Sequence, residues 1–462
     1  MSHVSGAVPL AQMDAAEDVR PPAFSDEALA LTFAERHADT LRYVAPWGKW
    51  HVWTGTHWKP DDTLAAFDMA RAICREAAAS CNKERARALI ASAKTVAAVE
   101  RLAKSDRRLA ATVDQWDADP WLLNTPAGTI DLKTGTGREH RQTDHITKCT
   151  AVAPGTAGCP LWLAFLHRVT DGNADLIGYL QRLAGYGLTG STQEHVLPFA
   201  HGAGGNGKGV FIAAISGAMG DYHKTAPIET FAASSGDRHP TELAMLRGAR
   251  LVTAQETEEG RRWAESRIKS LTGGDRIAAR FMRADFFEFT PQFTLLIAGN
   301  HKPGLRSVDE AIRRRFHLIP FDVTIPTSEQ DKSLGEKLKA EWPGILTWMI
   351  QGCLAWQRQG LQPPAVVLSA TASYLEGQDA LSAWLDECCE RDPDGWEGRK
   401  DLFASWKAWA ERSGEFVLPR TRFLDALETR GLTAHRQPGT GSRGFAGVRI
   451  VRRDYGDDPW AR

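Results

Sequence analysis

Residues 196–211 read VLPFAHGAGGNGKGVF, and this stretch decides the fold of the chain. The apolar residues 196–200 predict a buried strand, and the glycine-rich loop after them leads into a helix-like pattern. The spacing from Gly202 to Gly207 and Lys208 is that of a P-loop. Glycines let successive backbone N–H groups turn inward around phosphate oxygens, while the helix start and the lysine add positive charge. A chance glycine-rich turn is the alternative for this short motif alone.

The whole loop is expected to line the phosphates of a nucleotide. The residues in question are Gly202, Gly204, Gly205, Asn206, Gly207, Lys208 and Gly209. Gly209 departs from the usual pattern, because P-loops commonly carry Ser or Thr there to bind Mg²⁺ through the hydroxyl.

Composition narrows the class of protein. The chain has 462 residues, enough for two to four domains, with 43% hydrophobic and 24% charged residues. Its net charge of −1 means that nucleic acid could bind only through local basic patches. The seven cysteines form no C-x-x-C pair, so we expect reduced thiols and no zinc site. The N-terminus has no signal pattern and no run is long enough to span a membrane, which predicts a cytoplasmic protein.

Strand-like stretches follow the P-loop at intervals. Residues 250–256, 293–300 and 317–323 are apolar, and helical text separates them. This alternation predicts an α/β fold, with a mainly parallel sheet that has helices on both faces.

The N-terminal third reads as a mixed α+β region. Residues 1–23 are small, polar and expected to be disordered; a helix capped by Ser25 follows over 25–44. Residues 47–60 predict a hairpin, and its tryptophans could stack on bases, although packing against neighbouring helices is the favoured interpretation. Two helices come next, one with Leu64 on its buried face, and then short strands from Trp121 onward.

The C-terminal residues 372–462 predict a separate domain. Residues 399–462 contain 13 Lys and Arg against 8 Asp and Glu, and two helices precede a glycine-rich basic ribbon. This is the outline of a winged helix, with Arg420, Arg422 and Arg443 as candidate DNA contacts. A solvated basic face in a protein–protein domain is the alternative.

Three further groups complete the expected chemistry at strand ends. Glu256 closes one strand and is the candidate acid that holds Mg²⁺ or orients water. Asn300 closes the next strand and can sense the nucleotide. Arg314 and Arg315, in DEAIRRRF, are the candidates for an arginine finger that reaches a neighbouring subunit.

A hairpin is expected between Glu256 and Asn300. Residues 276–281 and 286–290 are β-like, which places Arg280 and Arg283 near the turn. Such a hairpin could contact DNA phosphates in a central pore, whereas a surface hairpin that pairs its arginines with Asp275 and Asp285 is the alternative.

These features together resemble the helicase part of the phage and plasmid primase family, a superfamily 3 group related to the poxvirus primase-helicase. The matching stretches cover about residues 25–325: PWLLNTPAGTIDLKTG, ITKCT, CPLW, YLQRLAGYGLTG, GAGGNGKGVF, DEAIRRRF and the block from LVTAQETEEG to LLIAGNHKP. The resemblance implies an AAA+-like P-loop ATPase, with Lys208 as P-loop lysine, Glu256 as Walker B acid and Asn300 as sensor. It also implies Arg314 or Arg315 as finger and Arg283 as the basic residue of the pore hairpin.

On this basis we expect six segments along the chain. They are a tail (1–23), an α+β N-terminal domain (24–150), a helical collar (151–195), the ATPase core (196–325), a helical segment (326–371) and a winged-helix-like domain (372–462). No catalytic primase domain is expected before the helicase, so a separate primase is a candidate partner.

The functional hypothesis is an ATP- and Mg²⁺-dependent helicase of phage or plasmid replication, acting in the cytoplasm of a bacterial host. A homo-hexameric ring would hold single-stranded DNA in its pore and duplex at the C-terminal domain. Gly209 would leave Mg²⁺ to Glu256, water and ATP itself, with weaker metal affinity. An origin-binding or loading factor that uses ATP only to assemble is the main alternative, and a small-molecule kinase is a weaker one.

Overall fold

The structure is a computed structural model, and it describes most of the chain. The described residues are 20–233, 241–256, 263–282, 285–302, 304–305, 309–377, 380–393, 395–415, 417–430, 432–437 and 441–451. Within these ranges the side chains at positions 256, 377, 422 and 429 are not described.

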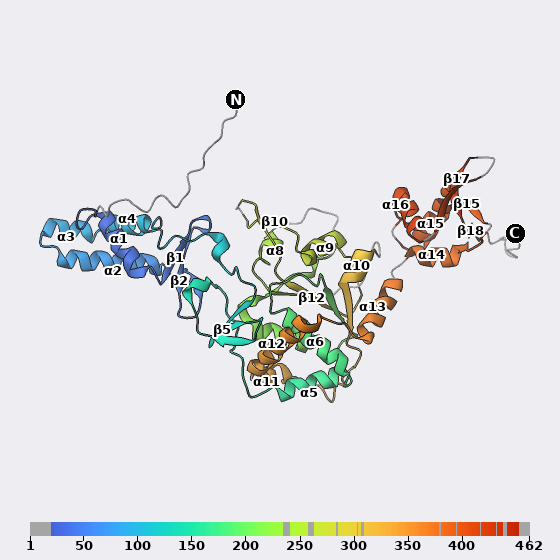
Figure 1. Cartoon of the computed structure of the whole chain (residues 1–462), viewed down its shortest axis with the longest axis horizontal. Helices are drawn as coiled ribbons and strands as arrows, with labels where there is room; N and C mark the ends of the chain where they lie inside the picture. Colours follow the sequence, from blue (N-terminus) through green and yellow to red (C-terminus); the bar gives the residue numbers. More distant parts are fainter. Residues whose placement is uncertain are drawn as a thin grey trace, which may run out of the picture.

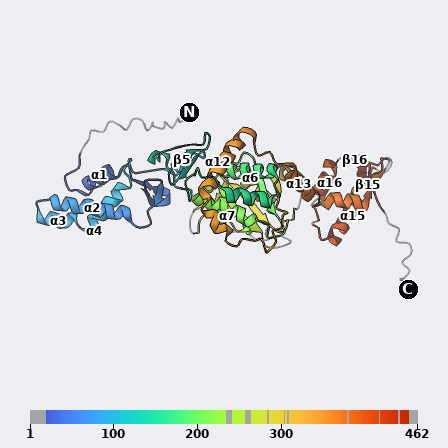
Figure 2. The same cartoon turned by 90° about the horizontal axis from the view of Figure 1, so that it is seen from below.

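Three parts follow one another along the long axis of the molecule (Figures 1 and 2). A helical N-terminal part lies at one end, an α/β part lies in the middle, and a smaller C-terminal part lies at the other end. No helix among the described residues is long and apolar enough to cross a membrane.

The N-terminal part begins with α1, whose cap the sequence predicts correctly. The Ser25 side chain accepts a hydrogen bond from the Ala28 N–H at 3.2 Å, and α1 spans Asp26–His37. The other elements are β1 (Leu41–Val44), β2 (Lys49–Trp53), β3 (Trp58–Pro60), α2 (Ala65–Ser80), α3 (Glu84–Ile90) and α4 (Ala93–Ala103). The three strands form one antiparallel sheet, so the predicted hairpin over 47–60 is present.

Three helix predictions in this part are wrong in detail. The first helix does not continue to residue 44, because Leu41–Val44 pairs with β2 instead. Leu64 is 72% exposed and has a φ of +61°, so it precedes α2 rather than packing from it. The second predicted helix is divided into two, because the Ser92 side chain caps the N–H of Thr95 and starts α4.

The tryptophans of the hairpin pack rather than face solvent. Trp58 is fully buried, and Trp116 lies against it with ring centroids 5.8 Å apart at 85°. Trp47 is half-buried and lies 6.1 Å from the same Trp116 ring. The packing interpretation of this cluster is therefore confirmed.

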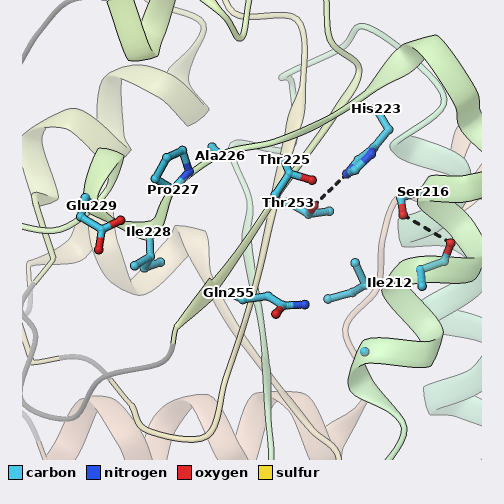
Figure 3. A pocket seen from close by; sticks show the side chains of 12 residues that line it. Ile212, Ser216, His223, Thr225, Ala226, Pro227, Ile228, Glu229, Thr253 and Gln255 are labelled. Carbon is cyan, nitrogen blue, oxygen red and sulfur yellow. Dashed lines mark hydrogen bonds between the residues drawn. The ribbon is translucent and has the colours of Figure 1, made fainter.

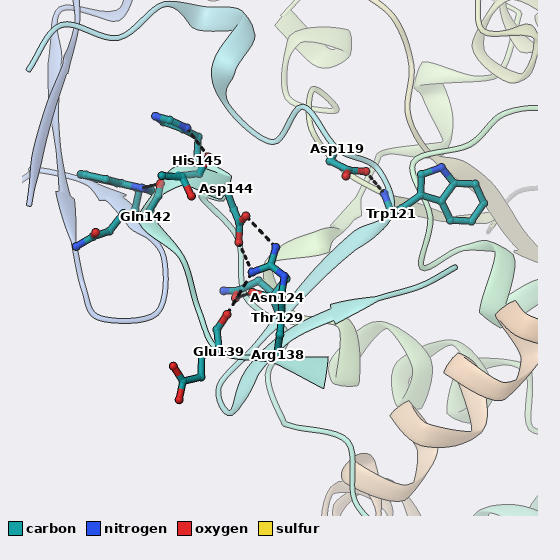
Figure 4. Close-up of polar contacts among 11 residues, drawn as sticks. Asp119, Trp121, Asn124, Thr129, Arg138, Glu139, Gln142, Asp144 and His145 are labelled. Atoms are coloured by element: carbon teal, nitrogen blue, oxygen red, sulfur yellow. Dashed lines mark hydrogen bonds and ion pairs between the residues drawn. The ribbon is translucent and has the colours of Figure 1, made fainter. Parts of the chain in front are cut away.

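Three antiparallel strands connect the N-terminal part to the centre: β4 (Leu122–Thr125), β5 (Gly128–Asp131) and β6 (Thr136–Arg138). Gly128 has a φ of +151° and a Cβ there would lie 2.5 Å from the Arg138 carbonyl oxygen, so only glycine fits. Arg138 donates two hydrogen bonds to Asp144 at 2.8 and 2.9 Å (Figure 4). Leu123 packs in the same hydrophobic cluster as residues of the central helices. The core of the central part therefore includes a residue from before position 150, where the sequence places a domain boundary.

The central sheet has five strands, all parallel, in the order β13-β7-β12-β9-β8. They are β7 (Leu197–His201), β8 (His223–Thr225), β9 (Leu251–Glu256), β12 (Thr294–Gly299) and β13 (Phe316–Pro320). All six residues of β12 are buried, as expected for a central strand of a parallel sheet. The α/β prediction with a parallel sheet is confirmed.

Helices surround this sheet. They are α5 (Pro160–Val169), α6 (Ala174–Tyr186), α7 (Lys208–Met219), α8 (Thr241–Ala244), α9 (Glu265–Gly273), α10 (Glu310–Arg315), α11 (Leu334–Lys339), α12 (Trp342–Gln359) and α13 (Ala365–Gly377). Two hydrophobic clusters of buried side chains lie about the sheet, one shared with α5, α6, α7 and α12 and the other with α9 and α13. Helices α6 and α12 pack backbone to backbone, because a Cβ at Gly185 would lie 2.0 Å from the Cys353 nitrogen.

The C-terminal part has its own core of tryptophan and phenylalanine side chains, including Trp384, Trp406 and Phe423. Its elements are α14 (Ala380–Cys388), β14 (Cys389–Glu390), β15 (Trp396–Gly398), α15 (Arg399–Arg412), α16 (Arg420–Thr429), β16 (Thr433–Arg436), β17 (Arg443–Ala446) and β18 (Arg449–Ile450). Strands β15, β17 and β16 form one sheet and β14 pairs with β18. Helix α13, which crosses the expected boundary at residue 372, packs on β13 through a bond from the Leu318 N–H to Thr371 Oγ1.

Candidate nucleotide site

The strand register brings the predicted site residues to one edge of the sheet. His201, at the end of β7, pairs with Gly299 of β12, and Gly299 also pairs with Glu256 of β9. The P-loop and Asn300 therefore start directly after adjacent strands. The backbone of Glu256 lies at the same edge, and its side chain is outside the description.

The loop itself depends on glycine at specific positions. Gly204, Gly205 and Gly207 have φ values of +108°, +62° and +83°, in the region that L side chains rarely adopt. A Cβ at Gly207 would lie 2.6 Å from Val169 Cγ1 and 2.9 Å from the Phe165 ring, both on α5. Helix α5 therefore presses against the loop, so that the loop geometry is fixed by packing as well as by its own sequence.

Lys208 is the first residue of α7, and it is only 7% exposed. Its Nζ donates to the Gly202 carbonyl at 2.7 Å, to Asn206 Oδ1 at 2.8 Å and to Asn300 Oδ1 at 3.1 Å. All three acceptors are neutral, and burial lowers the pKa of Lys208. A phosphate group at this place would give the ammonium group an opposite charge as a partner.

Two contacts hold the loop from the segment after β13, and sequence reasoning missed both. Asn206 is buried, and its Nδ2 donates to the Phe321 carbonyl at 2.7 Å. The Ile325 N–H donates to the Gly205 carbonyl at 3.0 Å. Asn206 therefore accepts a hydrogen bond from Lys208 and donates one to Phe321, which links the P-loop to the segment after β13. The spacing of the loop residues alone does not reveal this role.

A second polar group near the loop is His201. Burial lowers its pKa, and the positive charges of Lys302 and Lys208 act in the same direction, against the opposite effect of Asp322. His201 is therefore neutral at pH 7, and the positive charge beside the P-loop comes from Lys208 and Lys302.

A cavity of about 420 Å³ lies beside the start of α7 (Figure 3). It lies between α7 and the strands β8 and β9, and its lining includes Gly209, Thr253, Glu229 and Gln255. The Gln255 side chain extends from β9 toward Ile212 of α7 (Figure 3), and it was not singled out from the sequence.

The lining of this cavity determines which groups are available to bind a metal ion beside Lys208. A Cβ at Gly209 would meet nothing within 4 Å, so this position is open and has no side-chain hydroxyl of its own, although Ser216, Thr225 and Thr253 line the same cavity. Among the described residues, no group of three or more His, Cys, Asp or Glu side chains could hold a metal ion by itself. Gly209 therefore leaves room beside Lys208 and contributes no side-chain ligand there.

The three consecutive arginines lie on α10, which Asp309 caps by accepting from the Ile312 N–H at 2.9 Å. Arg313 and Arg314 are exposed. Arg315 is half-buried, and its Nη1 donates to the Ala311 carbonyl at 2.9 Å. Arg313 and Arg314 are therefore accessible to a neighbouring molecule, whereas Arg315 contacts its own helix.

The predicted hairpin is formed by β10 (Ile277–Ala279) and β11 (Phe287–Phe289), which pair antiparallel. Arg280 is exposed and lies over the Phe286 ring at 4.8 Å. Arg283 lies outside the described residues. The ion pair recorded on this hairpin joins Arg276 to Glu288 at 3.9 Å, between two exposed side chains, so its contribution is small.

The candidate DNA contacts of the C-terminal part are placed as follows. Arg420 is exposed at the start of α16, and Arg443 is exposed on β17, where it pairs with Arg436 of β16. The side chain of Arg422 is not described.

Comparison with known protein families gives two matches. Residues 30–171 match the family described as D5 N terminal like, and residues 200–315 match DUF5906, a family of unknown function.

Curated relatives come from viruses, and each bears the name "Putative helicase". The chain is 24% identical over 348 residues to one from Acanthamoeba polyphaga mimivirus, covering 70% of this chain and 36% of the relative. It is 24% identical over 276 residues to one from Frog virus 3, covering 54% and 28%. A third, from Invertebrate iridescent virus 6, is 26% identical over 236 residues, covering 48% and 24%. The chain therefore spans about a quarter to a third of the length of these relatives.

Among solved structures, the apo C-terminal region of NrS-1 resembles the chain with a TM-score of 0.49 at 9% identity, covering 91% of this chain and 98% of that one. A second structure of that region gives a TM-score of 0.49 at 11% identity, covering 92% and 99%. Similarity at this level is too weak to carry an argument about the site.

The parallel sheet and the glycine loop that ends in a buried lysine define a P-loop α/β protein. Residues 30–171 match the D5 N-terminal-like family, and curated relatives of the chain bear helicase names. The resemblance to the viral and phage primase-helicase group is thus confirmed.

Proposed function

We propose that this chain is an ATP-dependent DNA helicase that works as a ring of identical subunits, with six as the expected number. The observation that carries the proposal is the position of Lys208. Its ammonium group is buried where β7 enters α7, within 3.1 Å of the Asn300 amide from the adjacent strand. This is a place where a phosphate chain and a nucleotide-sensing amide can meet.

The nucleotide roles follow from that edge of the sheet. The backbone N–H groups of the loop bind the phosphates, and Lys208 exchanges a neutral acceptor for a phosphate oxygen. Asn300, which already contacts Lys208, then responds to the outermost phosphate. Glu256 acts as the acid that orients water, because its backbone lies beside Gly299 at this edge.

Mg²⁺ fits this site as a companion of ATP rather than as a resident ion. When bound, it neutralises charge on the outer phosphates. Glu256 would contribute to holding it, directly or through water, and Gly209 leaves room for that water.

A neighbouring copy of the chain supplies the remaining positive charge. Arg314 is exposed on α10 and is the preferred finger, whereas Arg315 is the second candidate because it contacts its own helix in the single chain. An arginine delivered in this way makes hydrolysis depend on assembly.

DNA would contact two separate places. Arg280 and Arg283 on the hairpin face single-stranded DNA in the pore of the ring. Arg420, Arg422 and Arg443 in the C-terminal part contact duplex DNA. A separate primase would make primers on the strands that this chain opens.

The test is unwinding of a forked DNA duplex under multiple-turnover conditions with Mg²⁺ and ATP. The wild-type chain is expected to separate the strands, and Lys208→Ala is expected to abolish both unwinding and ATP hydrolysis while keeping the thermal stability of the fold. Lys332→Ala, at an exposed lysine, is the matched control and is expected to retain activity. Full turnover by Lys208→Ala would reject the proposal.

One observation favours a second candidate function. Gly209 removes the usual metal-binding hydroxyl, which suits a protein that binds ATP to assemble on DNA and hydrolyses it slowly. Such an origin-binding or loading factor would form an ATP-dependent complex with DNA, yet it would leave the forked duplex intact in the same assay.

A further inference from the structure

The hairpin formed by β10 and β11 carries a row of phenylalanine rings that runs from its buried base toward its exposed end. Phe289 is buried, and the Phe287 ring lies 6.1 Å from it. The Phe281 ring lies 5.6 Å from Phe287, with an angle of 25° between the two planes. The outermost ring is therefore held nearly parallel to the ring behind it.

The outer end of the row exposes an unusual amount of apolar surface. Phe281 is 47% exposed, Met282 is 77% exposed and Phe286 is 62% exposed. Covering such side chains with a binding partner removes apolar surface from water and so favours association. A cluster of three at one hairpin end is therefore a candidate binding surface rather than a chance exposure.

Guanidinium groups accompany the rings. Arg280 lies over the Phe286 ring at 4.8 Å and is exposed. Arg247 lies over Phe287 at 5.2 Å, on the inner part of the row, and also over Trp47 of the N-terminal part at 5.7 Å. The rings are therefore interleaved with positive charge along the hairpin.

Exposed aromatic rings beside a positive charge favour some binding partners over others. A purely apolar partner surface would leave the charge of Arg280 without a counterpart, whereas an anionic chain with flat rings matches both components. In duplex DNA the bases are already stacked inside the helix, so their flat faces are not accessible. Single-stranded DNA offers both its phosphates and its base faces.

We propose that Phe281 and Phe286 are stacking platforms for unpaired bases of single-stranded DNA, with Arg280 at the adjoining phosphate and Met282 as an apolar contact. The inference rests on the proposed function, because it takes DNA as the substrate. It goes beyond that function by assigning base faces, and not only phosphates, as what the hairpin binds.

The base of the hairpin is built to keep these platforms in place. Ala279 and Phe289 are buried together with Ala244 of α8 in a small hydrophobic cluster. Arg247, three residues after Ala244, is half-buried between Phe287 and Trp47. Arg247 is thus a positioning residue that ties the row of rings to the N-terminal part.

The experiment compares two oligonucleotides of equal length, a normal thymidine strand and a strand whose central nucleotides lack bases. Binding is measured by fluorescence anisotropy with the full chain and a slowly hydrolysed ATP analogue. Each stacked base is worth about 1–3 kcal/mol, so the wild-type chain is expected to bind the abasic strand at least about tenfold more weakly. Phe281→Leu combined with Phe286→Leu is expected to remove that difference.

Two further variants serve as controls. Arg280→Gln is expected to weaken both strands equally and to reduce the salt dependence by about one phosphate contact, with the preference for bases retained. Leu89→Ala removes an equally exposed apolar side chain on α3 and is expected to change nothing. The basal ATP hydrolysis of the phenylalanine variant is expected to equal that of the wild type, which shows that the fold is intact.

Equal affinity of the wild type for both strands would overturn the proposal and leave phosphate contacts as the role of the hairpin. Loss of ring assembly in the phenylalanine variant, measured by light scattering without DNA, would also overturn it and assign the rings to a contact between copies. A wild-type chain that hydrolyses ATP and binds neither strand would instead reject the proposed function itself.

Discussion

The P-loop edge and the end of the β10–β11 hairpin are both candidate binding surfaces, yet they are built in opposite ways. At the P-loop edge, Lys208 is buried and has three hydrogen-bond acceptors within 3.1 Å. At the hairpin end, Phe281 and Phe286 are exposed beside Arg280. The first surface is organised before its ligand arrives, which suits a small ligand bound in one geometry. The hairpin end offers adaptable contacts, which suits a DNA strand that must be bound and released repeatedly.

The largest expected effect is on ATP hydrolysis, which a variant of the P-loop edge should lose and a variant of the hairpin end should keep. Lys208→Ala removes the buried charge and is expected to lower ATP hydrolysis by about 100-fold or more, because a charged donor to the reacting phosphates is lost. The double phenylalanine-to-leucine variant is expected to keep ATP hydrolysis without DNA unchanged. Steady-state phosphate release by both variants measures the contrast. Equal losses in the two would mean that the surfaces do not act separately.

Acid is expected to destabilise the N-terminal part near Trp47, the residue that Arg247 connects to the row of phenylalanine rings. Burial lowers the pKa of His51, next to Trp47, from 6.5 to about 4. Because the unfolded chain takes up a proton below about pH 6.5 and the folded chain does not until about pH 4, stability falls as the pH drops between these values. The loss is up to about 3 kcal/mol.

Tryptophan fluorescence during urea unfolding at pH 7 and pH 5 checks this, since the rings of Trp47 and Trp116 lie 5.3 and 4.8 Å from the His51 ring. His51→Phe is the control and is expected to remove only the share that His51 contributes, because burial also lowers the pKa of His223 and His317 to about 4. A wild-type unfolding midpoint that does not change between the two pH values would contradict the assignment.

A smaller loss of stability is expected from Gly207→Ala, which tests whether packing against α5 fixes the conformation of the P-loop. Gly207→Ala places a methyl group 2.6 Å from Val169 at a φ of +83°, and is expected to cost about 2 kcal/mol of stability together with nucleotide affinity. Gly209→Ala meets nothing within 4 Å and is the matched control, with unchanged or slightly higher stability. Thermal unfolding with and without ATP measures both, and equal melting temperatures would show that α5 does not constrain the loop.

The smallest effect concerns the metal. Gly209→Ser restores a hydroxyl group in the open space beside Lys208, and one added ligand worth about 1 kcal/mol lowers the Mg²⁺ requirement by about fivefold. The readout is the affinity for a fluorescent ATP analogue as Mg²⁺ is titrated, with Gly209→Ala for comparison. An unchanged Mg²⁺ midpoint would show that the ion does not approach position 209.

The sequence predicts the sheet and the edge that carries Lys208 and Asn300, because strands with strong apolar runs and a loop with fixed spacing are local signals. It fails where tertiary contacts decide. The helix predicted over 25–44 ends at His37 since the following residues pair with β2, and Leu64 is exposed despite its helical spacing. The bond from Asn206 to the Phe321 carbonyl spans 115 positions and has no signature in the spacing of the loop.

The functional surfaces show the same limit. The sequence indicates Arg280 on a hairpin, but the graded exposure from Phe289 to Phe281 appears only once the hairpin is packed on α8. Likewise, the run of three arginines does not say which of them project; in the structure, Arg313 and Arg314 are exposed, whereas Arg315 contacts its own helix.

The central claim is that one copy holds the nucleotide while the next copy supplies the arginine, and a mixing experiment tests it most directly. Lys208→Ala and the double variant Arg314→Ala with Arg315→Ala are each expected to be inactive in DNA-stimulated ATP hydrolysis. Mixed in equal amounts, they form some interfaces with an intact lysine on one side and an intact arginine on the other. The account predicts hydrolysis by the mixture well above either variant alone. A mixture as inactive as its two components, under conditions in which the copies assemble together, would contradict it.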